Sequence, residues 1–124
     1  MAIITNDTSD QLSTRELSLL ERVASLEDVI RRGGDEAQEL RRCPSFVIDA
    51  LVDAGLFRFT IPRELGGEDA SVGQTIEVLE AISAIDASVG WNVMLGSEIN
   101  AMAAGGMAKE LAEEVYLADP GVIM

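Results

Sequence analysis

The stretch from Ala87 to Ala104 constrains the fold more than any other part of this sequence. It carries a single charge, at Glu98, and its apolar residues leave no polar face on the helix that it would form. Asp86 precedes it with a side chain suited to cap the first free backbone N–H groups. We therefore predict a helix over 87–104, broken by Gly105-Gly106. A helix of this kind is buried on most sides or covered by a partner, so other elements must surround it.

Capping signals and apolar stripes predict further helices on both sides of that stretch. Ser13 with Glu16 and Ser71 with Gln74 both have the spacing of a capping box. The expected helices run from Leu17 to a stop at Gly33-Gly34, over 35–42, from Pro44 with Cys43 as N-cap to Gly55, from Ser71, and over 107–117. The helix that follows Ser71 is expected to bury one face, made of Val72, Ile76, Leu79 and Ile82.

The composition favours a single all-α domain. A chain of 124 residues suffices for one core, and 4% aromatic residues with three prolines suit aliphatic helix packing better than strands with many turns. We expect about five or six helices over residues 13–120, preceded by a flexible N-terminus at 1–12. Gly121-Val122-Ile123-Met124 has the pattern of the start of a strand.

The charge balance excludes several classes of partner. With 22 acidic and 9 basic residues, the net charge of −13 repels nucleic acid and anionic membrane surfaces. The acids are spread along the chain, which is typical of a solvated surface, although a basic partner would also suit them. No apolar run approaches a membrane span, no signal peptide is visible, and Cys43 has no second cysteine to pair with. We therefore expect a cytoplasmic location.

The residue types at hand leave no catalytic or metal-binding group to name. There is no histidine and one lysine, Lys109, so the common histidine-based nucleophile pairs and zinc sites are absent. Gly66-Gly67 lacks the pattern of a phosphate-binding loop and is interpreted as a loop that needs positive φ. Cys43 at a helix N-cap would have a lowered pKa, but no base partner is visible, so an incidental cysteine is the preferred interpretation.

Polar residues within the apolar 87–104 helix are the candidates for a binding site. Ser97 and Asn100 are three residues apart and share one side of the helix, whereas Trp91, Met94 and Leu95 share another. Such a helix often lines a ligand pocket with a few placed polar groups. The alternative is a core helix whose polar groups meet other helices. The substrate-pocket candidates are Trp91, Leu95, Ser97, Glu98 and Asn100.

The order of several motifs resembles the N-terminal domain of the acyl-CoA dehydrogenase family. A helix ends in Gly55-Leu56-Phe57, and the loop Ile61-Pro62-Arg63-Glu64-Leu65-Gly66-Gly67 follows. Two further helices contain Glu77-Val78-Leu79-Glu80-Ala81-Ile82 and Asp86-Ala87-Ser88-Val89-Gly90-Trp91. The last motif is similar to the branch that includes flavin-dependent monooxygenases. The resemblance spans about 35–120.

The resemblance implies an orthogonal helical bundle followed by a β-domain, of which 121–124 would be the start, and a C-terminal four-helix bundle. The flavin, FAD or FMN, would lie between those later parts, and the N-terminal domain would close the substrate pocket. Family members either dehydrogenate an acyl-CoA or hydroxylate a substrate with reduced flavin and oxygen. The resemblance places Trp91 and the stretch Ser97–Asn100 on the helix that faces the substrate.

Two departures from the family pattern bear on function. The monooxygenases often have a histidine within the stretch that corresponds to 97–100, where this chain has Glu98-Ile99-Asn100; this favours a dehydrogenase. The chain also ends about where the β-domain would begin. We therefore expect a pocket-forming domain that is inactive and binds no flavin by itself, completed by C-terminal domains of the same enzyme or by homo-oligomerisation. The alternative is a non-catalytic helical module that self-associates or binds a partner.

Overall fold

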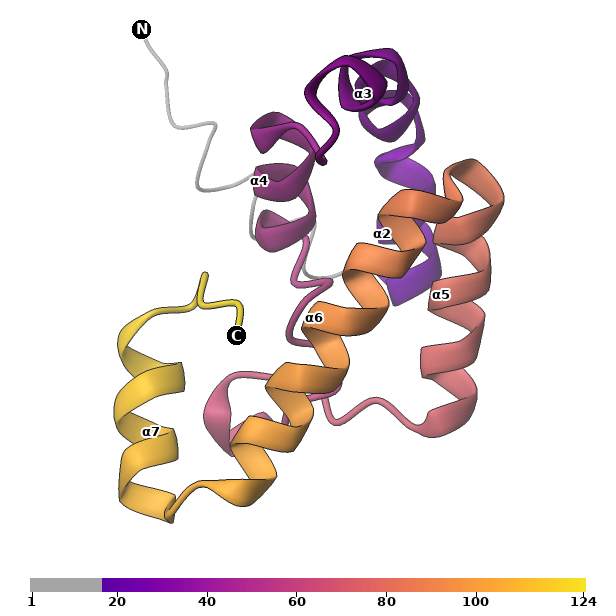
Figure 1. Cartoon of the computed structure of the whole chain (residues 1–124). Helices are drawn as coiled ribbons and strands as arrows, with labels where there is room; N and C mark the ends of the chain where they lie inside the picture. The colour runs from indigo at the N-terminus through magenta and orange to yellow at the C-terminus, as the bar shows by residue number, and fades with distance from the viewer. Residues whose placement is uncertain (1–16) are drawn as a thin grey trace, which may run out of the picture.

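The computed structural model describes residues 17–124, which form six α-helices and one 3₁₀-helix without any strand (Figure 1). This confirms the all-α prediction. The elements are α2 (Leu19–Ser25), α3 (Glu27–Leu40), α4 (Ser45–Asp53), η1 (Arg63–Leu65), α5 (Val72–Ile85), α6 (Ala87–Gly106) and α7 (Lys109–Ala118). The capping box proposed at Ser13 and Glu16 and the expected flexible segment 1–12 lie outside the described residues.

The first two helices depart from the predicted boundaries. A capping box does open α2, but it joins Ser18 and Glu21: the Ser18 N–H donates to Glu21 Oε2 at 2.9 Å, and the Glu21 N–H donates to Ser18 Oγ at 3.2 Å. The prediction that Gly33-Gly34 stops the helix and that a second one covers 35–42 was wrong. The chain bends at Leu26, and α3 then runs through both glycines to Leu40.

Packing against α4 explains why α3 keeps Gly33. Gly33 is buried, and a Cβ placed there would lie 2.5 Å from Val47 Cγ2. The close approach of the two helices therefore requires a residue without a side chain. The helix tolerates the glycine because its propensity cost, about 1 kcal/mol, is smaller than the gain from packing.

The α4 helix starts one residue later than predicted. Pro44, not Cys43, is its N-cap, and the helix runs from Ser45 to Asp53. Gly55 follows with φ of +73°, as the predicted helix end requires. The next segment, 56–61, has no regular structure and yet lies in the core. Its buried hydrophobic residues are Leu56, Phe57, Phe59 and Ile61.

The α5 and α6 helices form an antiparallel hairpin, in which α6 runs through the centre of the molecule (Figure 1). Both predicted N-caps are confirmed: Ser71 and Gln74 form a capping box, and the Asp86 carboxylate accepts from the N–H groups of Ser88 and Val89. The predicted buried face of α5 was partly wrong. Val78 and Ile82 are buried, whereas Ile76 is exposed and Val72 is 77% exposed.

The α6 helix joins two hydrophobic clusters. At its N-terminal half, Val89 and Val93 pack with α2 to α5; at its C-terminal end, Ala104 packs with Ile61, Leu65 and α7. The helix includes Gly105 and ends at Gly106, two residues beyond the predicted end at Ala104. Figure 1 shows α7 beside this end of α6, and residues 122–124 follow it without regular secondary structure.

Candidate functional site

The outer and inner faces of α6 divide the predicted site residues into two groups. Trp91, Leu95 and Glu98 lie one helical turn apart on the exposed outer face, where Trp91 is 60% exposed. Ile99 and Met102 continue this face toward the C-terminal end, and Met102 is 75% exposed. Ser97 and Asn100 are fully buried on the opposite face. The structure therefore brings three of the five candidates together and separates the other two from them.

The buried candidates are engaged within the domain. The Asn100 amide donates to the carbonyl of Phe57 at 3.0 Å, and its Oδ1 accepts from the N–H of Met124 at 3.2 Å. The Ser97 hydroxyl donates to Met94 O at 3.2 Å, and the Ser97 carbonyl accepts from the Thr60 hydroxyl at 2.9 Å. These bonds satisfy polar groups that burial would otherwise leave without water. Both residues thus fasten the irregular segment 56–61 to α6.

The close approach of Phe57 to Gly96 supports the same attachment. A Cβ at Gly96 would lie 2.5 Å from Phe57 Cδ1, so the phenyl ring occupies the space that a side chain at position 96 would need. Gly96 therefore permits the irregular segment to lie flat on the helix. The position of the outer face is consequently fixed by contacts made on the inner one.

Arg58 is a buried residue whose role the sequence analysis missed. Its guanidinium donates to the carbonyls of Tyr116 at 2.6 Å, Leu65 at 2.7 Å and Asp119 at 3.2 Å. These carbonyls lie at the C-terminal ends of α7 and η1, where they have no partner within the helix and where a positive charge is favourable. The available signal was a single charge between Phe57 and Phe59, which must find partners once that segment is buried.

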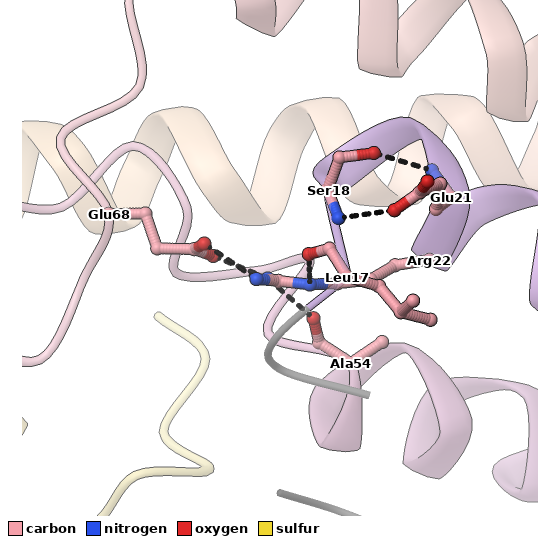
Figure 2. Close-up of polar contacts among 6 residues, drawn as sticks. All are labelled: Leu17, Ser18, Glu21, Arg22, Ala54 and Glu68. Atoms are coloured by element: carbon pink, nitrogen blue, oxygen red, sulfur yellow. Dashed lines mark hydrogen bonds and ion pairs between the residues drawn. The ribbon is translucent and has the colours of Figure 1, made fainter. Parts of the chain in front are cut away.

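Arg22 and Glu68 form a second polar centre that the sequence analysis missed. Figure 2 shows the Arg22 guanidinium between the Glu68 carboxylate, the Ala54 carbonyl and the Leu17 carbonyl. The two ion-pair hydrogen bonds measure 2.6 and 2.8 Å. This pair joins α2 to the end of α4 and to the loop after η1. No local pattern indicates it, because the partners are far apart in the sequence.

Two clefts lie elsewhere on the described surface. One, of about 430 Å³, lies between α2 and α5 and includes Leu20, Gln74 and Glu77. The other, of about 330 Å³, lies beside Arg22, Arg58 and Glu68. Neither includes any of the five predicted pocket residues. The outer face of α6 is thus exposed and lines neither of these two clefts.

The glycine loop does not have the form of a flavin-phosphate site. In the glycine loop, the Gly66 N–H donates to Arg63 O and the Gly67 N–H to Pro62 O, so neither is directed at a ligand. Gly66 has φ of +86°, and a Cβ at Gly67 would collide with the Ile61 carbonyl. The loop interpretation of Gly66-Gly67 is therefore confirmed: its glycines serve a turn and a close backbone approach.

The environment of Cys43 differs from that of a reactive thiol. Cys43 precedes the N-cap of α4 and is half-buried against the core. Burial, with a smaller contribution from the negative charge of Asp86, raises the pKa of its thiol. The lowered pKa considered for an N-cap cysteine is thus wrong, and an incidental cysteine fits the structure.

The described part of the chain presents neither a candidate metal cluster nor a candidate membrane span. Over residues 17–124, no three cysteine, aspartate or glutamate side chains converge in a way that would hold a metal ion. Within the same range, no helix combines the length and the apolar character needed to cross a bilayer.

Comparison with known proteins identifies the domain. The family model of the acyl-CoA dehydrogenase N-terminal domain matches residues 16–119. Indole-3-acetate monooxygenase of Acinetobacter baumannii is 32% identical over 77 residues, which cover 62% of this chain and 19% of that protein. The oxygenase component of an FADH2-dependent resorcinol hydroxylase from Rhizobium sp. is 36% identical over 73 residues, 59% of this chain and 18% of that protein.

A third relative aligns over more of the chain. The oxygenase component of p-hydroxyphenylacetate 3-hydroxylase from Acinetobacter baumannii is 27% identical over 104 residues, 84% of this chain and 24% of that protein. No solved structure matches the chain. The chain spans about a fifth of the length of these relatives. With a family model that covers nearly all of its described residues and a helical fold to match, this chain belongs to the acyl-CoA dehydrogenase family, as its N-terminal domain.

Proposed function

We propose that this domain serves a flavin-dependent monooxygenase and that the outer face of α6 forms one wall of its substrate site. The observation that carries the proposal is the exposure of Trp91, Leu95 and Met102 on a helix whose opposite face is held rigidly by Ser97 and Asn100. Large apolar side chains on a rigid element, left uncovered, are typical of a binding surface.

The oxygenase branch is preferred over the dehydrogenase branch because of the relatives. By their names, the three relatives act on indole-3-acetate, resorcinol and p-hydroxyphenylacetate, which are all aromatic. The lack of a histidine at 97–100 had favoured a dehydrogenase, and it is outweighed by these matches. An aromatic substrate also suits Trp91, whose exposed indole offers a face or an edge for ring packing.

In this proposal the domain binds the substrate and shapes its pocket, and it takes no part in proton transfer. Glu98 is the single charge on α6 and lies on the outer face between Leu95 and Met102, where it would orient a hydroxyl or N–H of the substrate. The flavin, FAD or FMN, is held by other parts of the enzyme. We expect this chain alone to be inactive, and we place the enzyme in the cytoplasm.

The test uses the natural enzyme that carries this domain, assayed with reduced flavin, oxygen and an aromatic acid such as p-hydroxyphenylacetate. We expect Trp91→Ala and Leu95→Ala to raise KM by roughly tenfold each, the size of a lost apolar contact. Val72→Ala removes an even more exposed apolar side chain from α5 and is expected to leave KM unchanged. Equal effects of all three variants would contradict the assignment of α6.

A flavin-binding assay tests the claim that the chain alone does not bind flavin. The purified chain is mixed with FAD and passed through gel filtration, and the flavin absorbance of the protein fraction is measured. We expect no retained flavin. Retention of one flavin per chain would refute the proposed division of labour.

The second candidate function is self-association through the same outer face. The exposure of Met102 and Trp91 favours it too, because a large apolar surface is often a contact between proteins. Sedimentation velocity of the chain separates the two cases: a homodimer that Met102→Lys dissociates would support an interface, whereas a monomer at high concentration would exclude it.

A further inference from the structure

The carboxamide of Asn100 contacts the backbone on both sides of Ile123. Its Nδ2 donates to the Val122 carbonyl in a long contact of 3.5 Å, and its Oδ1 accepts from the Met124 N–H at 3.2 Å. In an extended segment, the carbonyl of one residue and the N–H two residues later point to the same side. The carboxamide therefore holds residues 122–124 as a peptide group of a neighbouring strand would.

A third backbone contact fixes which way the carboxamide faces. Its Nδ2 donates to the Phe57 carbonyl at 3.0 Å, and the Tyr116 hydroxyl, which donates to the backbone carbonyl of Asn100 at 3.0 Å, lies 3.4 Å from Oδ1. The amide oxygen thus faces the Met124 N–H, and the amide nitrogen faces two carbonyl oxygens. Rotating the amide by half a turn would set like groups against each other, so a single orientation is stable.

The clamped segment places Ile123 against α6. A Cβ at Gly96 would lie 3.3 Å from Ile123 Cγ2, so the missing side chain of Gly96 makes room for it. Ile99 lies three residues beyond Gly96, on the next turn, and belongs to the outer face. Ile123 and Met124 both keep about two fifths of their surface exposed. Their apolar side chains therefore extend the apolar surface of α6 sideways.

We propose that Asn100 is a positioning residue, whose carboxamide clamps residues 122–124 so that Ile123 becomes part of the substrate wall and helps to select the substrate. The clamp contacts only the backbone of that segment. It therefore fixes where residue 123 lies, and it does not depend on which side chain that residue carries. The role of Ile123 in selecting a substrate rests on the proposed function, whereas the clamp itself does not.

The clamp is tested on the chain alone by residue-resolved hydrogen exchange of the Met124 amide, measured by NMR. We expect Asn100→Leu to speed this exchange about tenfold or more and to abolish the nuclear Overhauser contact between Ile123 and Gly96. Asn92→Leu is the matched control, because Asn92 is an exposed asparagine on the same helix that bonds only within it. Equal Met124 exchange in the native chain and in a folded Asn100→Leu variant would overturn the clamp.

A second variant keeps the test decisive if Asn100→Leu does not fold. In a chain shortened to end at Gly121, the Asn100 side-chain amide loses its contacts with 122–124 but keeps the one with Phe57. We expect its side-chain N–H signals to shift and to exchange faster than in the full chain. Unchanged signals would overturn the clamp as well.

The selective role of Ile123 is tested in the natural enzyme with two aromatic acids of different ring size, indole-3-acetate and p-hydroxyphenylacetate. We expect Ile123→Ala and Asn100→Leu to change the ratio of kcat/KM between the two probes in the same direction, by roughly tenfold. A merely structural role would lower both values in proportion. An unchanged ratio in an active enzyme would overturn the role of Ile123, whereas no hydroxylation of either probe by the native enzyme would count against the proposed function and leave the clamp result standing.

Discussion

The guanidinium of Arg22 donates to both carboxylate oxygens of Glu68, at 2.6 and 2.8 Å, across 46 positions of sequence. Arg22 is only 4% exposed, and its guanidinium also donates to the carbonyls of Ala54 and Leu17. A buried guanidinium of this kind is tolerated because a carboxylate and several carbonyls surround it. The pair therefore holds α2, the end of α4 and the loop after η1 in one arrangement (Figure 2).

Removing the carboxylate tests that arrangement. We expect Glu68→Ala to lower the free energy of unfolding by about 2 kcal/mol, less than a fully buried pair would cost because the Glu68 side chain is partly exposed. The control is Glu27→Ala, which breaks the exposed pair between Glu27 and Arg31 and is expected to cost about 0.5 kcal/mol or less. Urea denaturation measures both. Equal losses would show that the Arg22 pair contributes no more than a surface pair.

The adjacent glycines of α3 give opposite predictions. Gly33→Ala is expected to destabilise the chain by about 1–3 kcal/mol, because its Cβ would lie 2.5 Å from Val47 Cγ2. Gly34→Ala meets only an ordinary contact and is expected to stabilise it by about 0.5–1 kcal/mol, since alanine favours the helix. Thermal unfolding followed by circular dichroism measures both. Val47→Ala should rescue part of the Gly33→Ala loss, and stabilisation by both alanines would contradict the packing account.

Acid should lower the stability of the folded chain by protonating Asp86, the N-cap of α6. The hydrogen bond from the Ser88 hydroxyl, with those from the Ser88 and Val89 N–H groups, lowers the pKa of Asp86 from its ordinary value of 3.8 against an opposing effect of burial. The unfolded chain therefore holds this proton more tightly than the folded chain does. The stabilisation is present above about pH 4 and is lost as the pH falls through the lower folded value.

Two variants of Asp86 separate the cap from the charge. Asp86→Asn keeps a capping oxygen, so we expect nearly native stability at pH 7 and a shallower loss between pH 5 and pH 2 than in the native chain. Asp86→Ala is expected to cost about 1 kcal/mol at pH 7. Urea denaturation at a series of pH values measures both. If the free energy of unfolding of Asp86→Asn fell with acid as steeply as that of the native chain, protonation of Asp86 would not be the cause of the loss.

The thiol of Cys43 should react slowly. Because burial and the charge of Asp86 raise its pKa, little thiolate is present at neutral pH. We expect the folded chain to react with an aromatic disulfide reagent at pH 7.5 more slowly than the urea-unfolded chain does. The absorbance of the released thiol follows both reactions. A folded rate equal to or above the unfolded one would show an activated thiol.

Local chemistry explains the parts of the fold that were predictable from sequence. The capping box at Ser71 and Gln74, the Asp86 N-cap and the positive φ at Gly55 each depend on residues within one turn of chain. Most of the helical segments and the starts of α5 and α6 could therefore be predicted, and so could the family, which rests on the order of such local motifs. For the same reason, the glycine loop was interpreted correctly.

Tertiary packing decided what local rules could not. Gly33 was predicted to end a helix, and only the approach of Val47 shows why the helix keeps it. The buried face of α5 and the division of α6 into outer and inner faces depend equally on which helices lie beside them. Periodicity placed Trp91 with Leu95 and Ser97 with Asn100, but it did not say which pair faces outward.

The sequence by itself determined a helical domain of this family and the stretch of α6 that carries the candidate site. The tertiary structure alone decided that Trp91, Leu95 and Glu98 form a surface while Asn100, on the opposite face, holds residues 122–124 against α6. It also decided the burial of Arg22 and Arg58. The reason is that local preferences act within one turn of chain, whereas burial depends on contacts between segments far apart in sequence, such as Arg58 with the end of α7.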